Sequence, residues 1–230
     1  MSFSNGFQNT LTKLVLLGAA VLLGAAVSVV SAQADNSPKS PESPISEAEK
    51  LLADLGYWIT KIDGKKDAST FHAITAFQKV EGRRRTGVVT PKELAAMRTA
   101  SRPAARYTGA AHIEIDIARQ VIFLVDENGK VSRILPVSTG NDKKYFDEGK
   151  WQKAYTPRGN YKITRQINGV RHAPLGDLYY PGYFLDGWAI HGSTSVPFFP
   201  ASHGCVRIPN FAAEDFSRLI RVDMNVFVYD

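Results

Sequence analysis

The sequence predicts a multidomain α+β protein, in which a small three-helix bundle precedes a mostly β domain that carries one or two helices. Two patterns along the chain support this fold class. Between residues 46 and 99, apolar residues recur at helical spacing in three segments that turn signals separate. After residue 108 the spacing becomes two, which is typical of strands. We therefore predict domains at 46–99 and 108–230, with linkers at 35–45 and 100–107.

The amino terminus predicts export. Residues 14–30 form an apolar run behind Lys13, and Ala32 and Ala34 supply the small residues of a cleavage site. These features predict a signal peptide over residues 1–34 and an exported protein of the periplasm or cell envelope. An uncleaved membrane anchor is the alternative, because the run approaches the roughly 20 apolar residues that a span needs. Only in that case would a membrane be a partner.

The charge balance favours an anionic partner other than nucleic acid. The chain has 28 Lys and Arg against 22 Asp and Glu, a net charge of +6. The basic residues are scattered and form no nucleic-acid motif, so we expect no nucleic acid as a partner. Anionic polymers of the cell envelope fit this charge better. The densest basic run, Arg83–Arg85, is expected to be a solvated face.

Capping and stop signals mark the three expected helices of the first domain. They are Ser46, Glu49 and Gly56 for the first helix, Gly82 for the second, and Thr90, Pro91 and Glu93 for the third. His72 lies among apolar positions of the second helix, and we expect it to pack there rather than to bind a metal.

Residues 46–98 resemble a peptidoglycan-binding-like domain, a three-helix module that targets cell walls. The resemblance is carried by Leu55-Gly56-Tyr57, Asp63-Gly64, Ala73, Phe77-Gln78, Gly82, Thr86-Gly87 and Val89-Thr90-Pro91. Most of these are turn, cap or core positions, so the resemblance predicts the fold better than the ligand. The bundle is expected either to bind glycan strands of the wall or only to space and pack against its neighbour.

The second domain is expected to be built from antiparallel strands. Apolar residues alternate from Ile113 to Ile117, and the chain reverses at Asn128-Gly129. Further strand-like segments are GNYKITRQI (159–167), GWAIHG (187–192) and NVFVYD (225–230), and a helix with an Asn210 cap is expected at NFAAEDFSRLI (210–220).

Cys205 is the only cysteine of the chain, so it cannot form a disulfide within the chain. A thiol becomes a good nucleophile as a thiolate, which a nearby imidazole can generate. His203 and His191 are both candidates, and spacing alone does not choose between them. The N–H groups of Gly204 and Cys205 could stabilise an oxyanion during acyl transfer.

The residues near Cys205 suggest two other kinds of site. His191, His203 and Cys205, with His172 as a fourth ligand, could bind zinc, but their spacing matches no familiar zinc motif. A serine hydrolase acting through Ser202 lacks the G-x-S-x-G turn. We therefore expect no metal and no other cofactor.

Residues 191–210, HGSTSVPFFPASHGCVRIPN, resemble the YkuD-type L,D-transpeptidase catalytic domain. The signature of that family is a His-Gly, a spacer and then Ser/Thr-His-Gly-Cys-x-Arg. Other similar stretches are IEIDIARQVIFLV (113–125), VSTG (137–140) and TPRGNYKIT (156–164), so that the likeness covers about 120 residues. The fold that it implies is a β-sandwich with one or two helices.

The resemblance implies a role for each signature residue. Cys205 matches the nucleophile, His191 the general acid/base, the carbonyl of Gly192 the group that orients His191, the N–H groups of His203, Gly204 and Cys205 the oxyanion hole, Ser202 and His203 supporting positions, and Arg207 a substrate-binding arginine. For Arg207 a structural ion pair is the alternative. The nearby aromatic residues, Tyr179, Tyr180, Tyr183, Phe184 and Trp188, are expected to lie mainly in the core, with one or two at a cleft rim.

The reaction that the resemblance implies is acyl transfer on peptidoglycan stem peptides. The thiol would cleave the bond before the terminal D-alanine of a tetrapeptide stem and pass the acyl group to an amine of a neighbouring stem. Water, a free D-amino acid or a lysine of another protein are alternative acceptors, and a non-enzymatic wall-binding protein is the alternative of another class.

Overall fold

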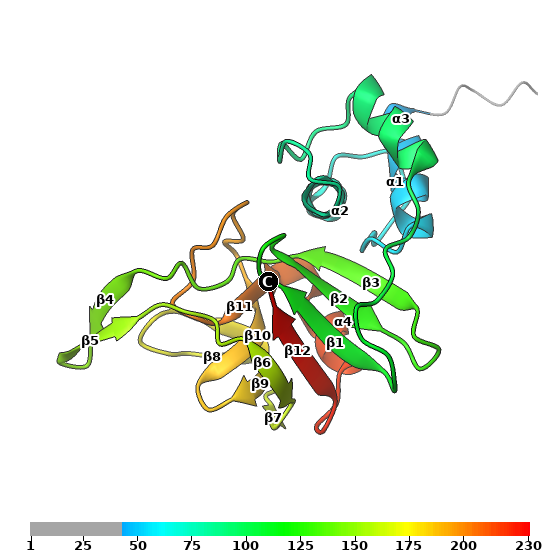
Figure 1. Ribbon diagram of the computed structural model, residues 1–230. Coiled ribbons are helices and arrows are strands. Elements are labelled where there is room, and N and C mark those ends of the chain that lie inside the picture. The colour runs from blue at the N-terminus through cyan, green and yellow to red at the C-terminus, as the bar shows by residue number, and fades with distance from the viewer. Residues whose placement is uncertain (1–42) are drawn as a thin grey trace, which may run out of the picture. The chain divides into compact units, whose positions relative to one another are not determined.

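The computed structural model describes residues 43–230 (Figure 1). The predicted signal peptide and most of the predicted linker at 35–45 lie outside the described residues. Helices in the described part are α1 (Pro44–Asp54), α2 (Ala68–Val80), α3 (Pro91–Thr99) and α4 (Asn210–Leu219). Strands are β1 (His112–Asp116), β2 (Val121–Val125), β3 (Val131–Pro136), β4 (Lys144–Asp147), β5 (Lys150–Lys153), β6 (Gly159–Lys162), β7 (Arg165–Gln166), β8 (Val170–Arg171), β9 (Leu178–Leu185), β10 (Trp188–Ser193), β11 (Val206–Pro209) and β12 (Asn225–Tyr229). Over residues 43–230, no helix is both long enough and apolar enough to cross a membrane.

The first helix begins earlier than the sequence predicts. Ser43 caps α1, because its hydroxyl accepts a hydrogen bond from the N–H of Ser46 at 3.1 Å. Pro44 follows in the first turn, where its missing N–H has no cost. The predicted capping box of Ser46 and Glu49 is therefore wrong. The predicted cap of the third helix is confirmed, since the Thr90 hydroxyl accepts from the N–H of Glu93 at 3.2 Å.

Glu49 holds the helical domain together from inside. Its buried carboxylate accepts hydrogen bonds from the N–H groups of Asp63 and Gly64, at 3.0 and 2.8 Å, and from the hydroxyl of Thr70 at 2.8 Å. One carboxylate thus joins α1 to α2 and to the turn before α2. Bonds to a buried charged acceptor are among the stronger ones in proteins.

Two packed sheets form the body of the second domain, and β4 and β5 form a separate two-stranded sheet (Figure 1). One has the order β3-β2-β1-β12-β6, and the other the order β11-β10-β9-β7 with β8 also paired to β9. Most neighbours are antiparallel, as predicted, but β1 with β12 and β10 with β11 are parallel. Their shared core includes Ile113, Ile115, Ile122, Leu124, Ile190, Val206 and Ile208, together with Phe216 of α4. The predicted sandwich-like β domain with a helix is therefore confirmed.

The expected cap of α4 is absent. Asn210 is the first residue of the helix, the N-cap position falls on Pro209, and no side chain bonds to the first turn. The apolar spacing was nevertheless informative, because Ala212 and Phe216 are buried against the sandwich.

The helical domain covers the outer face of β2 and β3, at one edge of the first sheet. Val121, Phe123 and Ile134 of β2 and β3 share an apolar core with Leu52 and Phe77 of the helices. Every residue of β1 and β2 is buried, although alternation would have left one face to solvent. The helices cover β2, whereas Glu114 of β1 accepts hydrogen bonds from the N–H groups of Arg106 and Tyr107. Of the two expectations for the bundle, the structure shows packing against its neighbour.

We predict that Glu49→Ala destabilises the protein strongly, because three donors lose a buried charged acceptor. The loss should be about 3 kcal/mol of unfolding free energy. Urea unfolding followed by circular dichroism measures it. Glu47→Ala is the matched control two residues away, since Glu47 pairs with Arg98 at the surface and its loss should hardly move the midpoint. Equal midpoints for the two variants would contradict the role given to Glu49.

Candidate active site

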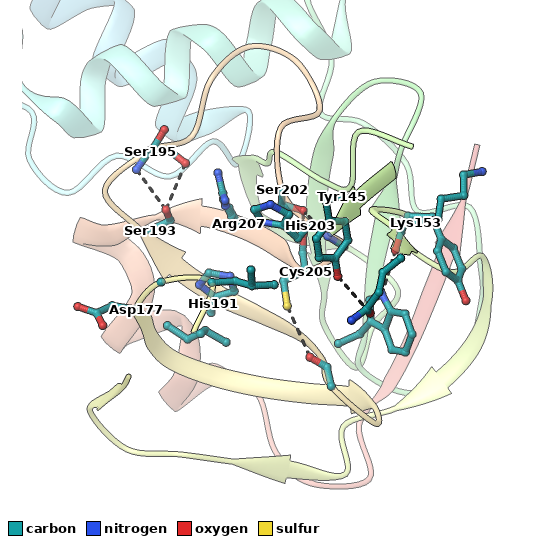
Figure 2. A pocket seen from close by; sticks show the side chains of 18 of the residues that line it. Tyr145, Lys153, Asp177, His191, Ser193, Ser195, Ser202, His203, Cys205 and Arg207 are labelled. Atoms are coloured by element: carbon teal, nitrogen blue, oxygen red, sulfur yellow. Dashed lines mark hydrogen bonds between the residues drawn. The ribbon is translucent and has the colours of Figure 1, made fainter. Parts of the chain in front are cut away.

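Parallel pairing of β10 and β11 brings the two ends of the signature together. β10 carries His191, β11 follows directly after Cys205, and His191 stands in register with Arg207. The histidine fourteen residues upstream of the thiol therefore lines the same pocket as Cys205 (Figure 2). His203 also lines this pocket, but it is exposed, and its ring packs edge-on against Tyr145 with the centroids 4.7 Å apart.

A backbone carbonyl fixes the tautomer of His191. Its Nδ1 lies 2.8 Å from the carbonyl oxygen of Gly192, which can only accept. Nδ1 therefore carries the proton and Nε2 is free to accept one. The side chain is 6% exposed, and burial, with a smaller contribution from the positive charge of Arg207, lowers the pKa of His191 to about 4 against the opposing effect of the Gly192 bond. The imidazole is thus neutral at pH 7.

Gly192 has to be a glycine at this position. A Cβ there would lie 2.4 Å from the Cβ of Ala213 and 2.8 Å from Oδ1 of Asn210. The first turn of α4 therefore packs directly against the backbone that orients His191.

The Cys205 thiol is half-buried and lies 3.6 Å from the carbonyl oxygen of Gly187, to which it donates. Burial raises the pKa of Cys205, and a backbone hydrogen bond at Ala189 and the charges of Arg207 and Arg171 oppose that rise. Burial therefore disfavours the charged form of each group, the thiolate of Cys205 and the imidazolium of His191.

Short hydrogen bonds set the shape of the turn at 202–205. The buried Ser202 hydroxyl donates to the carbonyl of Cys205 at 2.5 Å and accepts from the N–H of Gly204 at 3.0 Å. Thr156 donates to the carbonyl of Gly204 at 2.6 Å. The Ser202 hydroxyl thus both donates and accepts a hydrogen bond within the turn, which it stabilises. This arrangement does not favour the alternative in which Ser202 is the nucleophile of a serine hydrolase.

Gly204 adopts a backbone conformation that side chains disfavour. Its φ is +142°, and a Cβ would lie 2.8 Å from both the carbonyl oxygen of Tyr155 and Nε1 of Trp188. The N–H of Gly204 already donates to Ser202. Of the three N–H groups of the predicted oxyanion hole, those of His203 and Cys205 have no acceptor in the described part of the chain.

The pocket has a volume of about 750 Å³. Besides the signature residues, its walls are formed by Tyr145 and residues 150–153 of the β4–β5 hairpin, Tyr155, Tyr179, Gly187, Trp188, and the segments 175–178 and 193–195. Tyr183 and Phe184 are buried, whereas Tyr179 and Trp188 line the pocket and Tyr180 is half-buried, so fewer of these five aromatics lie in the core than expected.

Sequence reasoning missed the β4–β5 hairpin. Its signal is a pair of alternating segments around Glu148 and Gly149, both at positive φ, which suits a two-residue hairpin turn. The Thr156 hydroxyl was also missed, although its segment had been singled out.

Arg207 also lines the pocket. Over residues 43–230 no carboxylate lies within ion-pair distance of its guanidinium, so the structural ion pair that was its alternative role is not formed there. An unpaired guanidinium beside the thiol can receive a carboxylate of a ligand.

The zinc alternative does not assemble. In the described part of the chain, no three His, Cys, Asp or Glu side chains are placed to hold a metal ion. His172 is exposed and bonds to Asp177 at 2.7 Å. His72, at the other candidate position, packs near Phe71 and Phe211, as expected.

The chain is similar to known families and to solved structures. Residues 110–228 match the L,D-transpeptidase catalytic domain of the YkuD family, and residues 41–97 match a family described as a peptidoglycan binding domain. The crystal structure of an L,D-transpeptidase from Xylanimonas cellulosilytica is 37% identical, with a TM-score of 0.76, over 84% of this chain and all of that one. One from Stackebrandtia nassauensis is 21% identical, with a TM-score of 0.48, over 81% of this chain and 90% of that one.

A curated relative matches over a shorter stretch. Phenylcoumaran benzylic ether reductase 1 of Arabidopsis thaliana is 29% identical over 79 residues, which are 34% of this chain and only 26% of that protein. The chain therefore spans about a quarter of the length of that relative.

The chain belongs to the L,D-transpeptidase family, since the catalytic-domain family spans residues 110–228, more than half of its length. Its enzyme class is that of the L,D-transpeptidases.

We predict that the resting thiol reacts slowly at neutral pH. Because burial raises the pKa of Cys205, alkylation by iodoacetamide should increase with pH with a midpoint above that of an ordinary cysteine, about 8.5. The chain has one cysteine, so intact mass reports on this site alone. Cys205→Ala, which should take up no label, is the control. A midpoint below about 7 would show a resting thiolate.

Proposed function

We propose that this chain is an exported cysteine acyltransferase that cross-links peptidoglycan in the cell envelope. In this proposal Cys205 cleaves the bond before the terminal D-alanine of a tetrapeptide stem, and the acyl group passes to an amine of a neighbouring stem. The product is a link between the third residues of two stems.

One observation carries the proposal. His191 presents a free Nε2 to the pocket that holds Cys205, because Nδ1 is committed to Gly192. A neutral imidazole with a fixed tautomer is what a general base for a neutral thiol requires.

Acylation then follows from the groups in place. His191 Nε2 takes the thiol proton as Sγ attacks the carbonyl carbon of the stem. The N–H groups of His203 and Cys205 stabilise the oxyanion, and that of Gly204 joins them if it turns away from Ser202. As the intermediate collapses, the C–N bond breaks, the Nε2 proton moves to the leaving amine, and D-alanine departs from a thioester on Cys205.

Deacylation reverses the proton path. An amine of a second stem gives its proton to Nε2 as it attacks the thioester, and the sulfur leaves and is reprotonated by the imidazolium. Water in place of the amine gives hydrolysis, a free D-amino acid gives exchange, and a lysine of a protein gives anchoring. The proposal takes the stem amine as the acceptor.

Two features support a peptidoglycan substrate. The unpaired Arg207 in the pocket matches the carboxylate of a stem peptide. The helical domain matches a peptidoglycan-binding family, and binding of glycan strands by this domain is part of the proposal.

Substitutions should rank the two histidines. Cys205→Ala is expected to abolish D-alanine release, because no other thiol can form the acyl-enzyme. His191→Ala should lower kcat by about 10³-fold or more, whereas the exposed His203→Ala should lower it less. Release of D-alanine from a disaccharide-tetrapeptide measures each rate. Turnover by the cysteine variant, or the reverse order of the histidines, would overturn this assignment.

The products decide the acceptor. Residues 35–230 would be incubated with disaccharide-tetrapeptide, and the products weighed by mass spectrometry. We expect the mass of a dimer that has lost one D-alanine. The mass of the tripeptide alone would indicate hydrolysis, and the absence of both, with the protein sedimenting with cell walls, would favour a binding protein.

A further inference from the structure

Lys79 reaches from the helical domain into the β domain. It lies on α2 and is 2% exposed. Its Nζ donates to the carbonyl oxygens of Gln120 and Val137, at 3.1 and 2.9 Å, and both carbonyls belong to the β domain. In the described part of the chain no carboxylate pairs with this amine. Burial lowers the pKa of Lys79 to about 7, so much of this amine is neutral at pH 7, and a neutral amine still has the two N–H groups that these carbonyls accept.

Gln120 connects Lys79 to Thr139, because its backbone carbonyl bonds to Lys79 and its side-chain amide bonds to Thr139. Gln120 is buried with a φ of +61°, a conformation that non-glycine residues adopt only where their surroundings hold it. Its amide Nε2 donates to the carbonyl of Ile117 and to Oγ1 of Thr139, each at 2.7 Å, and its Oε1 accepts from the N–H of Thr139 at 2.9 Å. Every polar atom of the amide is satisfied, which makes this a rigid connection.

Thr139 fixes the position of residues 202–205, the turn that carries Cys205. Its carbonyl oxygen accepts from the N–H groups of Ala201 and Ser202, at 3.0 and 2.9 Å. Ser202 then bonds to the carbonyl of Cys205. The neighbouring Ser138 exchanges two backbone bonds with Arg207, both at 3.1 Å. Residues 137–140, the VSTG segment, therefore brace the chain on both sides of the thiol.

The helical domain also holds the loop between β10 and β11. Nη1 of Arg85 donates to the carbonyl oxygen of Phe198 at 2.6 Å, and the rings of Phe71 and Phe198 lie 5.9 Å apart. Arg83 pairs with Glu93 at 2.8 Å. The expectation that Arg83–Arg85 form a solvated face is therefore wrong for two of the three residues, because half-buried Arg83 pairs with Glu93 and half-buried Arg85 bonds to Phe198 in the β domain.

We propose that Lys79 is a positioning residue for the reaction, which holds the Cys205 turn through Gln120 and Thr139 and so makes the helical domain part of the catalytic machinery. The test of this proposal by kcat for D-alanine release rests on the proposed function, whereas its test by the pH profile of Cys205 alkylation does not.

Two near-isosteric substitutions break the connection at different points. Lys79→Met removes the two donated hydrogen bonds while keeping similar volume, and Thr139→Val removes the hydroxyl that accepts from Gln120. Each should lower kcat for D-alanine release by about tenfold with KM changed less than about twofold. Each should also shift the pH profile of Cys205 alkylation. The melting temperature of Lys79→Met should change little, because the desolvation cost of burying the amine offsets its two hydrogen bonds.

Three further variants make the test specific. Thr139→Ser restores the hydroxyl and should recover most of the activity that Thr139→Val loses. Arg98→Ala removes a side chain that bonds only Glu47 within the helical domain, and should leave kcat and the alkylation profile as in the wild type. The double variant Lys79→Met/Thr139→Val should lose less than the product of the two single losses, because both break one path.

The proposal is overturned if Lys79→Met keeps the wild-type kcat and alkylation profile. It is also overturned if the loss of kcat disappears when each protein is assayed the same number of degrees below its own melting temperature. If Lys79→Met fails to fold, the proposal is tested by comparing kcat of Thr139→Val with that of Thr139→Ser. Equal kcat values for these two variants overturn the proposal. A wild type that releases no D-alanine, with alkylation profiles that still separate Lys79→Met from Arg98→Ala, would refute the proposed function and keep the positioning role.

Discussion

The hydrogen bond from Nδ1 of His191 to the carbonyl of Gly192 is the interaction on which the site depends. It leaves Nε2 as the acceptor and holds the ring without a carboxylate. A carboxylate would also stabilise an imidazolium, as in Ser-His-Asp sites, whereas a neutral carbonyl does so only weakly. Burial and the nearby Arg207 disfavour that cation further. The proton that His191 accepts is therefore held weakly and is readily passed to a leaving amine.

Rigid elements surround this bond. The parallel pairing of β10 and β11 fixes the register of His191, and α4 packs against the bare backbone of Gly192. By contrast, the turn at 202–205 belongs to no strand and takes its shape from the hydroxyls of Ser202 and Thr156. The site thus joins a base on a strand to a nucleophile on a turn, and only the turn needs bracing from elsewhere. This difference explains why the connections described above converge on Cys205 and not on His191.

Local patterns predicted much of the fold, and their failures have physical causes. The helices and the period-two strands were predictable because each buries one face. The parallel pairing of β10 and β11 was not, since periodicity does not reveal partners. The β4–β5 hairpin was missed because it has no core of its own, and Phe146 and Trp151 are 61% and 70% exposed. The signature residues came from a family resemblance, whereas Lys79 gave no signal because its acceptors are carbonyls, which every residue has.

The burial that keeps the Cys205 thiol protonated has a consequence for its chemical lifetime. Oxidants, like alkylating agents, attack the thiolate, and the steps to sulfinic and sulfonic acid are irreversible for most proteins. A chain with one cysteine cannot protect it by forming an internal disulfide. Generating the thiolate only when a substrate carbonyl is in place limits this damage. A thiol that stays protonated between turnovers reacts more slowly with oxidants, so the enzyme remains reduced for longer.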